Sequence, residues 1–380
     1  MPITLTNEQQ DFVAAVRDFC ERECGTREKR DKLTDGGEHH HSQVIYDKMA
    51  ELGWLGVSSP EEYGGAGGGM VDLCLFLEET TRGLAPIGGF GISMIVQGAY
   101  ERFGTAEQKE SMISGIVGGN VEAIAMSEPE AGSDVGNLKC RAERSNGSYV
   151  INGQKTWISE AHVAKHILLV CRTDGSGSKH EGMTMLEVPA DAEGVEISPI
   201  PTMGGKIVND VFFTDCHVDA GALIGTEGQA WKQLMAGLNV ERLILGAVMV
   251  GAAERTFDDL LAYVKERNQF GRPIGSFQAL RHRIADLATE IECAKLLCFD
   301  VAAAVDRDPS RMFPREASMA KLKATEVAKK VSLEGMQMMG GYGYASEYDM
   351  EGHVRRALVS TIYGGTSEIQ REIISKTFGL

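Results

Sequence analysis

The sequence predicts an α+β protein of several domains, in which a β unit lies between two helical regions. Three observations support this class. The chain has 380 residues, which is more than one hydrophobic core usually contains. Its first and last thirds carry apolar residues at helical spacing. The middle third instead has short β-prone runs separated by turn residues.

The first region, residues 1–119, is predicted to be all helical with glycine-rich breaks. Two apolar stripes mark its helices: Phe12, Val13, Val16 and Phe19, then Met49, Leu52 and Leu55. The glycine-rich segment 60–69 follows no β-prone run, which favours a connector between helices over a nucleotide-binding turn. The three histidines 39–41 follow two glycines in a polar segment, where a solvated loop is expected rather than a metal site.

The second region, residues 120–225, is predicted to be a β domain. Asn152-Gly153 stands between two β-prone runs and predicts a hairpin turn. Further strands are expected at 166–172, 183–188 and 208–213.

The third region, residues 226–380, returns to helices. One is expected behind Ser276 as N-cap, and a second is expected to end at Gly340-Gly341. A short final helix is predicted to open at Ser367, with Gln370 completing a capping box. The methionines at 336, 338 and 339 favour packing in a core over a ligand groove.

Composition narrows the function. A net charge of −16 argues against nucleic-acid binding, so an anionic ligand would need local positive charge. The longest apolar run, 243–253, is too short for a membrane span, and the N-terminus shows no secretory leader. The eight cysteines form no C-x-x-C pair. Reduced thiols are expected, in a bacterial cytoplasm or, as the alternative, a mitochondrial matrix.

Glu241 is the main candidate for chemistry. On a helix it shares a face with Leu238, Leu245 and Val248, so its carboxylate lies in an apolar stripe. Desolvation raises the pKa of such a carboxyl toward values useful to a general base. On the pattern alone, the favoured interpretation is a helix-end glutamate paired with a neighbouring arginine.

Two further segments offer polar groups next to flat apolar surface. The turn 127–134 has hydroxyls and exposed N–H groups that suit a polar ring and a phosphate, although an ordinary turn has the same composition. Trp157, Ile158 and Ser159 place an indole beside a hydroxyl, which is also common in core packing. The i,i+4 pair His162 and His166 lacks a metal-binding pattern, so no metal is assigned.

Five ordered blocks resemble the acyl-CoA dehydrogenase family over essentially the whole chain. They are MSEPEAGSD at 126–134, NGQKTWIS at 152–159, ERNQFG at 266–271, QMMGG at 337–341 and IYGGTSEIQR at 362–371. The resemblance implies an N-terminal helical domain, a middle β-barrel-like domain and a C-terminal four-helix bundle. It also implies FAD bound at the subunit interfaces of a homotetramer, a dimer of dimers.

The resemblance further implies which residues contact FAD. Beside the flavin it places a first group: Met126, Ser127, Gly132, Ser133, Trp157, Ile158 and Ser159. A second group reaches the FAD of a neighbouring subunit: Arg267, Gln269, Phe270 and Gln278. A third group contacts the rest of the cofactor: Gln337, Met338, Gly340, Gly341, Thr366 and Glu368. Arg267 would supply the positive charge that the overall balance lacks.

The base is where the chain departs from the commonest branch of the family. That branch has a catalytic glutamate before a Gly-Thr pair near the C-terminus, where this chain has Gly364. The long-chain and isovaleryl branches keep the glutamate on a helix before Arg-Leu, as Glu241 is here. Glu241 is therefore predicted to be the base, and Gly364 to donate its N–H to the thioester carbonyl. Arg356 and the segment 159–162 also differ from the usual pattern.

The implied reaction is α,β-dehydrogenation of an acyl-CoA to a trans-2-enoyl-CoA. Glu241 would take the α-proton, flavin N5 would take the β-hydride, and an electron-transfer flavoprotein would reoxidise the flavin. Ser133, Arg242, Tyr363 and Gly364 are the expected substrate contacts. Two alternatives stay open: a flavin oxidase or monooxygenase on the same fold, and a non-catalytic subunit. The acyl chain cannot be read from the sequence.

Overall fold

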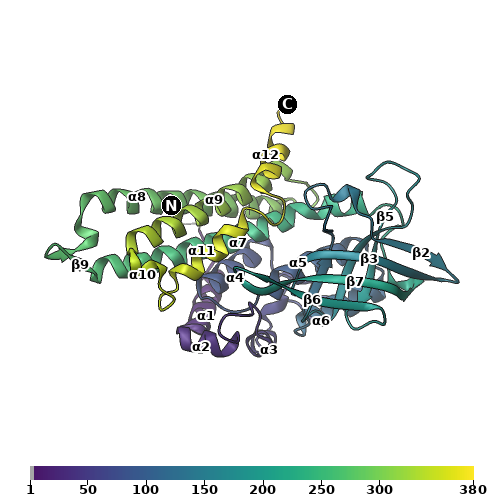
Figure 1. Cartoon of the computed structure of the whole chain (residues 1–380), viewed down its shortest axis with the longest axis horizontal. Coiled ribbons are helices and arrows are strands. Elements are labelled where there is room, and N and C mark those ends of the chain that lie inside the picture. Colours follow the sequence, from purple (N-terminus) through teal and green to yellow (C-terminus); the bar gives the residue numbers. More distant parts are fainter. Residues whose placement is uncertain (1–3) are drawn as a thin grey trace. The chain divides into compact units, whose positions relative to one another are not determined.

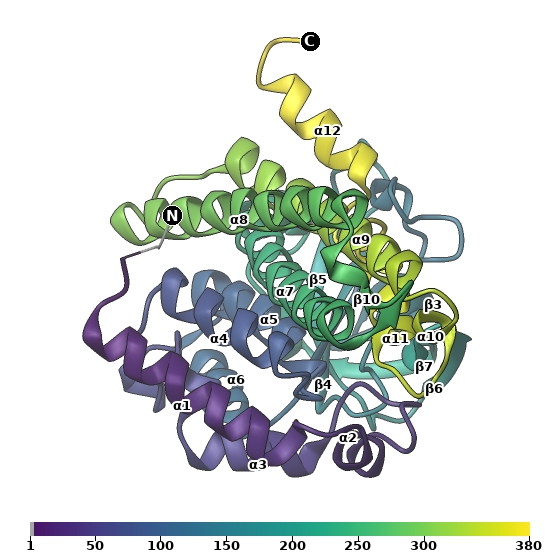
Figure 2. The same ribbon diagram turned by 90° about the vertical axis from the view of Figure 1, so that its left-hand side faces the viewer.

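The computed structural model describes residues 4–380, apart from the side chains of residues 236 and 238–240. It consists of two compact units, each built from separate stretches of chain. The helical unit comprises Met1–Arg30, Gly69–Ala85 and Asn239–Leu380. The sheet unit comprises Asp31–Gly68 and Pro86–Leu238. Figures 1 and 2 show the elements of both units.

Six α-helices precede the sheet: α1 Asn7–Cys24, α2 Arg27–Leu33, α3 Gln43–Glu51, α4 Met70–Arg82, α5 Gly89–Phe103 and α6 Ala106–Val117. The first predicted stripe is confirmed, since Val13, Val16 and Phe19 are buried in α1. The second is partly wrong, because Leu52 is 51% exposed at the end of α3. The segment 60–69 contains only a single short 3-10 turn, Glu61–Tyr63, before α4 begins.

Eight strands form the sheet: β1 Glu122–Ala125, β2 Arg141–Ser145, β3 Ser148–Ser159, β4 His166–Arg172, β5 Met183–Pro189, β6 Val195–Thr202, β7 Gly205–Asp219 and β8 Leu223–Ile224. Their order is β6-β7-β3-β2-β4-β5-β8, and β1 pairs with β4 in parallel. The strand predicted at 166–172 matches β4, whose central residues are buried on both faces. The strand β6 was not predicted, and none of its residues is fully buried.

The predicted turn at Asn152-Gly153 is wrong. Both residues lie inside β3, where the pairing with β7 shifts register between Ile151 and Gly153. The hairpin that joins β2 to β3 instead turns at Asn146-Gly147. Both residues of that turn have positive φ, 49° and 83°, as a tight two-residue hairpin turn needs. Two Asn-Gly pairs in one region therefore have different roles, a turn and a bulge.

The histidine segment 39–41 is not a solvated loop. His41 is only 7% exposed and forms a β-bridge with Ile87. The Nε2 atom of His41 lies 3.2 Å from Oε1 of Gln43, and the centroids of the His39 and His162 rings lie 5.6 Å apart with the rings tilted by 38°. The segment is packed because its backbone pairs with the residues before α5, which hydropathy does not reveal.

After the sheet come six α-helices: α7 Ala230–Glu266, α8 Gln278–Arg307, α9 Pro314–Met339, α10 Gly341–Tyr344, α11 Met350–Ser360 and α12 Ser367–Lys376. Within the helical unit, α9 packs against α8, α11 and α12 (Figure 2). The hairpin of β9 Asn268–Gln269 and β10 Arg272–Pro273 joins α7 to α8 at one end of this bundle (Figure 1).

The predicted ends of these helices are partly right. The helix α9 stops at Met339 before Gly340, whose φ is +63°, as expected. The N-cap of α8 is Phe277, and the Ser276 hydroxyl donates to the carbonyl of Pro273 instead. Ser276 thus ends the short 3-10 turn Ile274–Ser276 and lies one residue before the N-cap of α8.

All eight cysteines are free thiols, and all but Cys293 are buried. Within residues 4–380, no helix combines the length and apolar character needed to cross a bilayer.

Candidate active site

Glu241 lies in α7 and its side chain is half-buried. Burial raises the pKa of its carboxyl, while the positive charges of Arg242 and Lys321 oppose that rise. No hydrogen bond or ion pair holds this carboxylate within the described part of the chain. The arginine-paired alternative therefore lacks support here. The side chain of Leu238, one of its predicted neighbours, lies outside the described residues.

Gly364 is next to Glu241, although the two residues come from distant parts of the helical unit. A Cβ atom built on Gly364 would lie 3.6 Å from Oε1 of Glu241 and only 2.2 Å from Cδ1 of Leu245. The backbone of Gly364 has φ +59°, a left-handed conformation. Its N–H donates to no acceptor among residues 4–380. A residue with a free N–H thus lies next to an unpaired carboxylate.

Two side chains that sequence reasoning missed hold the loop around Gly364. Gln370 donates from Nε2 to the carbonyls of Gly364 (3.0 Å) and Gly365 (2.9 Å). The predicted capping box is therefore wrong, and Thr366 alone caps α12 by accepting from the N–H of Ile369. The second side chain is Lys321, which donates to the carbonyl of Gly365. Its signal was available, since it is a charged residue in an apolar helix face.

The predicted substrate contacts Arg242 and Tyr363 are both enclosed in the helical unit. Arg242 is 9% exposed, and burial lowers the pKa of its guanidinium. The hydroxyl of Tyr363 lies 3.5 Å from the sulfur of Met249, and burial raises its pKa to about 12. Arg242 directly follows Glu241 in the chain, and Tyr363 directly precedes Gly364. Both side chains are hydrogen-bond donors that keep their protons at neutral pH.

In the sheet unit, the loop that begins at Met126 is fixed against the end of β3. The ammonium of Lys155 donates to the carbonyl of Met126 (2.9 Å) and to the carboxylate of Glu128 (2.8 Å). The N–H of Thr156 donates to the carbonyl of Ser127. The loop therefore runs alongside the Trp157 segment. Further along it, Gly132 and Ser133 are exposed, and a Cβ at Gly132 would meet no atom within 4 Å.

Trp157 is the clearest sign of a ligand in the sheet unit. Its side chain is 59% exposed and its φ is +62°, which is rare for a bulky residue. The pairing of β3 with β7 shifts register between Lys155 and Ile158. This bulge turns the indole outward while Ile158, 2% exposed, stays in the core. An exposed indole beside a half-buried Ser159 hydroxyl fits one face of a flat heteroaromatic ring such as a flavin.

The remaining predicted cofactor residues lie in the helical unit, mostly on its surface. Phe270 is 94% exposed at the tip of the β9–β10 hairpin with φ +53°, and Gln269 beside it is also exposed. Gln278 is the exposed first residue of α8. At the end of α9 and just beyond it, the Met338 side chain is buried. The other predicted residues there, Gln337, Gly340 and Gly341, are exposed. Glu368 is exposed in the first turn of α12.

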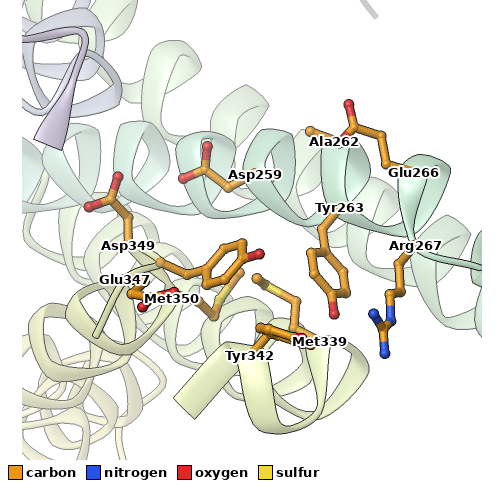
Figure 3. Close-up of a pocket in the computed structure, with 11 residues that line it drawn as sticks. Asp259, Ala262, Tyr263, Glu266, Arg267, Met339, Tyr342, Glu347, Asp349 and Met350 are labelled. Atoms are coloured by element: carbon orange, nitrogen blue, oxygen red, sulfur yellow. The ribbon is translucent and has the colours of Figure 1, made fainter. Parts of the chain in front are cut away.

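Arg267 lines a cavity of about 490 Å³ within the helical unit. Its guanidinium lies over the ring of Tyr342, 5.1 Å from the centroid (Figure 3). Tyr263 and Tyr348 line the same cavity, together with the carboxylates of Asp259, Glu266, Glu347 and Asp349. Of the predicted cofactor residues, only Arg267 lines this cavity. Arg267 therefore brings one positive charge to an otherwise acidic and aromatic surface.

Arg356 is a residue where the chain departs from the family pattern. It is linked through His353 to Asp259, which lines this cavity. Its Nη2 lies 3.1 Å from Nδ1 of His353, whose Nε2 lies 2.8 Å from the Asp259 carboxylate. Burial lowers the pKa of Arg356 to about 10, with Asp349 opposing the shift. The arginine is thus part of a buried network in place of a surface ion pair.

Comparison with known proteins shows the family to which the chain belongs. Three family models match in succession: "Acyl-CoA dehydrogenase, N-terminal domain" over residues 6–120, "middle domain" over 123–216 and "C-terminal domain" over 228–379. A probable acyl-CoA dehydrogenase of Bacillus subtilis, YngJ, is 36% identical, with 99% of each chain covered. A caffeyl-CoA reductase–Etf complex subunit of Acetobacterium woodii is 34% identical, covering 97% of this chain and 98% of that protein.

A solved structure shares the fold along the whole chain. The crystal structure of an acyl-CoA dehydrogenase from Geobacillus kaustophilus has a TM-score of 0.93 and 33% identity, with 100% of each chain covered. The three family models, the relatives and this solved structure all indicate the same family over the whole length of the chain. The chain belongs to the acyl-CoA dehydrogenase family and is an oxidoreductase.

Proposed function

We propose that the protein catalyses α,β-dehydrogenation of an acyl-CoA thioester to a trans-2-enoyl-CoA, with Glu241 as the base. The observation that carries the proposal is the unpaired Glu241 carboxylate beside the free N–H of Gly364. A base and an oxyanion donor at one point are what removal of a proton next to a carbonyl requires.

Gly364 acts first in this reaction. Its N–H donates to the thioester carbonyl oxygen, where negative charge grows as the α-proton leaves. The N–H needs no reorganisation, because its loop is already held by Gln370 and Lys321. Such a pre-aligned donor stabilises the enolate-like transition state and makes the α-proton more acidic.

Glu241 then accepts the α-proton on its carboxylate. Its pKa is raised by burial, so the group binds a proton more readily than an exposed glutamate would. The nearby charges of Arg242 and Lys321 limit that rise and favour the ionised, basic form at neutral pH. FAD, when bound, supplies the acceptor for the hydride that leaves Cβ.

Other residues are assigned to holding the two ligands. Trp157 and Ser159 would contact the flavin ring, and the loop 126–133 would contact its polar edge. Arg267, with the other predicted cofactor residues of the helical unit, would bind FAD of a second subunit in a homotetramer. Arg242, Tyr363 and Ser133 would contact the acyl-CoA. The Etf-complex relative supports an electron-transfer flavoprotein as electron acceptor.

The test is anaerobic mixing of the FAD-loaded protein with a panel of acyl-CoAs of different length and branching. A substrate should bleach the oxidised flavin spectrum and yield the enoyl-CoA. Glu241→Gln should bind FAD and acyl-CoA but reduce the flavin orders of magnitude more slowly, and Glu241→Asp should lie between the two. Wild-type rates in Glu241→Gln would refute the assignment of the base.

The same experiment separates the alternatives. Rapid return of colour on admitting air would indicate an oxidase or monooxygenase. A protein that never takes up FAD would indicate a non-catalytic subunit. Because a relative is a caffeyl-CoA reductase subunit, enoyl-CoAs are also mixed with the chemically reduced protein, which measures the reverse direction at the same site.

A further inference from the structure

Lys321 is a lysine with no exposed side-chain surface, in the middle of α9. Its neighbours on the same helix face include the buried Ala317 and Ala324. Placing an ammonium group in such surroundings costs free energy unless its protons are used in hydrogen bonds. Burial lowers the pKa of Lys321 to about 8. The charge and the protons of a lysine buried in this way are expected to have a specific role.

The ammonium of Lys321 donates hydrogen bonds to backbone carbonyls on both sides of Gly364 in the chain. It donates to the carbonyl of Ser360 (3.0 Å), at the end of α11, and to that of Gly365 (2.9 Å). Gln370, in the first turns of α12, donates to the carbonyls of Gly364 and Gly365. Two side chains thus fix the loop 360–365 by three of its carbonyl oxygens.

Those bonds hold a backbone conformation that the loop would not adopt freely. Gly364 and Gly365 both have positive φ, 59° and 79°. Two consecutive left-handed residues are entropically costly to fix in one conformation, even for glycine. With the carbonyls turned toward Lys321 and Gln370, the N–H of Gly364 is left without a protein acceptor.

The charge of Lys321 reaches Glu241 as well. Within residues 4–380, no carboxylate lies at ion-pair distance from its ammonium. The groups that face it electrostatically are Glu241, which has the larger effect, then Arg242 and Glu368, and the ring of Tyr363 lies 5.9 Å from Nζ. In return, its charge favours the ionised carboxylate of Glu241.

We propose that Lys321 is the positioning residue of this site: its buried ammonium holds the 360–365 loop so that the Gly364 N–H meets the thioester oxygen, and supplies the cation that favours the Glu241 carboxylate. The inference rests on the proposed function. It assigns Lys321 two separable effects, one geometric and one electrostatic, and no contact with the substrate.

The test measures proton removal without hydride transfer. The FAD-loaded enzyme is incubated in D₂O with a 3-thiaacyl-CoA, in which sulfur replaces the β-carbon, and exchange of the α-protons is followed by NMR. Lys321→Met should slow exchange by about tenfold to hundredfold, as small misplacement of a reacting group does. Lys323→Met, the same change at a surface residue of α9 that pairs with Glu290, should leave exchange unchanged.

The pH profile separates the two effects. Exchange needs the Glu241 carboxylate, so its rate rises with pH through the pKa of that group. Removing a nearby cation disfavours the carboxylate and raises this pKa, so the acidic limb should move to higher pH in Lys321→Met. Gln370→Leu breaks the other carbonyl bonds without changing charge, so it should slow exchange and leave the acidic limb in place.

Lys321→Met that folds, binds FAD and keeps the wild-type rate and profile would overturn the assignment. Should that variant fail to load FAD, Lys321→Gln keeps a donor but no charge, and it should show the shifted limb with a smaller loss of rate. An unshifted limb there overturns the electrostatic effect, and wild-type exchange in Gln370→Leu overturns the geometric one. Wild-type protein that neither exchanges α-protons nor reduces its flavin would instead refute the proposed function.

Discussion

The side chain that Gly364 lacks would enter the space next to the carboxylate of Glu241: a Cβ at residue 364 would lie 3.6 Å from Oε1 of Glu241. The same Cβ would lie 2.2 Å from Cδ1 of Leu245, one helical turn further along α7. A larger residue at 364 would therefore require the Leu245 side chain to move.

Gly364→Ala should both destabilise the protein and slow flavin reduction. A left-handed residue with a Cβ costs about 1–2 kcal/mol, and the contact with Leu245 adds to that. In a Leu245→Ala background the contact disappears, so the same change should cost less. Denaturant unfolding of the four proteins measures the difference.

Gly36→Ala is the matched control for this pair. Gly36 also has a positive φ, +68°, but a Cβ there would meet nothing within 4 Å. It should show only the conformational cost, and Leu245→Ala should not change it. An equal cost of Gly364→Ala with and without Leu245 would contradict the proposed crowding.

Trp157→Gly should weaken FAD binding without weakening the fold. The indole is 59% exposed and its backbone has a positive φ, so glycine relieves strain and loses little packing. Stacking of a flat heteroaromatic ring on an aromatic side chain is worth about 1–3 kcal/mol, and FAD affinity should fall accordingly. Thermal unfolding of the FAD-free protein should be unchanged or shifted upward.

Trp157→Phe serves as the conservative comparison, because it keeps a ring in the same bulge. It should recover most of the affinity measured by fluorescence titration with FAD. If Trp157→Gly bound FAD as tightly as the wild type, the indole would not be the flavin contact.

Glu160 should make the protein less stable as pH rises. Its carboxyl is 1% exposed, neither oxygen has a hydrogen-bond partner among the described residues, and burial raises its pKa to about 8. In the unfolded chain the pKa of glutamate is about 4.3. Between those values folding takes up a proton, so this group lowers stability by up to about 1.4 kcal/mol per pH unit.

Glu160→Gln removes that titration, so its stability advantage over the wild type should grow from pH 5 to pH 8 and then level off. Urea unfolding at several pH values measures it, with the exposed Glu193→Gln in the same unit as control. A constant difference across this range would show that Glu160 is ionised in the folded protein.

Lys295→Met should destabilise the helical unit strongly. Its ammonium pairs with Glu78, whose side chain has no exposed surface, and lies 3.0 Å from the carboxylate of Glu254. Desolvation and the charge of Glu254 raise the pKa of Glu78 to about 8, so these carboxyls depend on the cation. Removing one partner of a buried ion pair costs about 3–5 kcal/mol.

The ion pair between Lys323 of α9 and Glu290 of α8 serves as the comparison. Lys323→Met breaks an ion pair with Glu290 that is about one-third exposed, and such pairs are worth about 0–1 kcal/mol. Lys295→Met should therefore lower the urea midpoint far more than Lys323→Met does. Similar midpoints would mean that the Glu78–Lys295–Glu254 cluster is uncharged or hydrated.

Local patterns predicted what a single element decides. The strand β4 was predicted at its observed bounds, because a run of buried β-branched and aliphatic residues needs no partner to be recognised. The end of α9 followed from Gly340 for the same reason. The two Asn-Gly pairs look alike in sequence, and only their pairing partners made one a turn and the other a bulge.

Side-chain hydrogen bonds were predicted less well than elements. The Ser276 hydroxyl and the Gln370 amide were each expected to accept from an N–H at a helix end, but each donates to a loop carbonyl instead. His41 is buried because the residues before α5 pair with its backbone. The partners of these groups depend on loop geometry and on the packing of segments, and neither can be read from the periodicity of the sequence.

By itself, the sequence determined the order of helices, sheet and helices, the family to which the chain belongs, and the presence of a glutamate in an apolar stripe of α7. Those properties follow from backbone geometry within one element and from ordered motifs. Only the tertiary structure decided that Glu241 and Gly364 meet, that a bulge turns Trp157 outward, and that Lys321 and Gln370 hold the loop. All of those relationships except the Gln370 bonds join residues distant in the chain, and they exist only because different elements pack against one another.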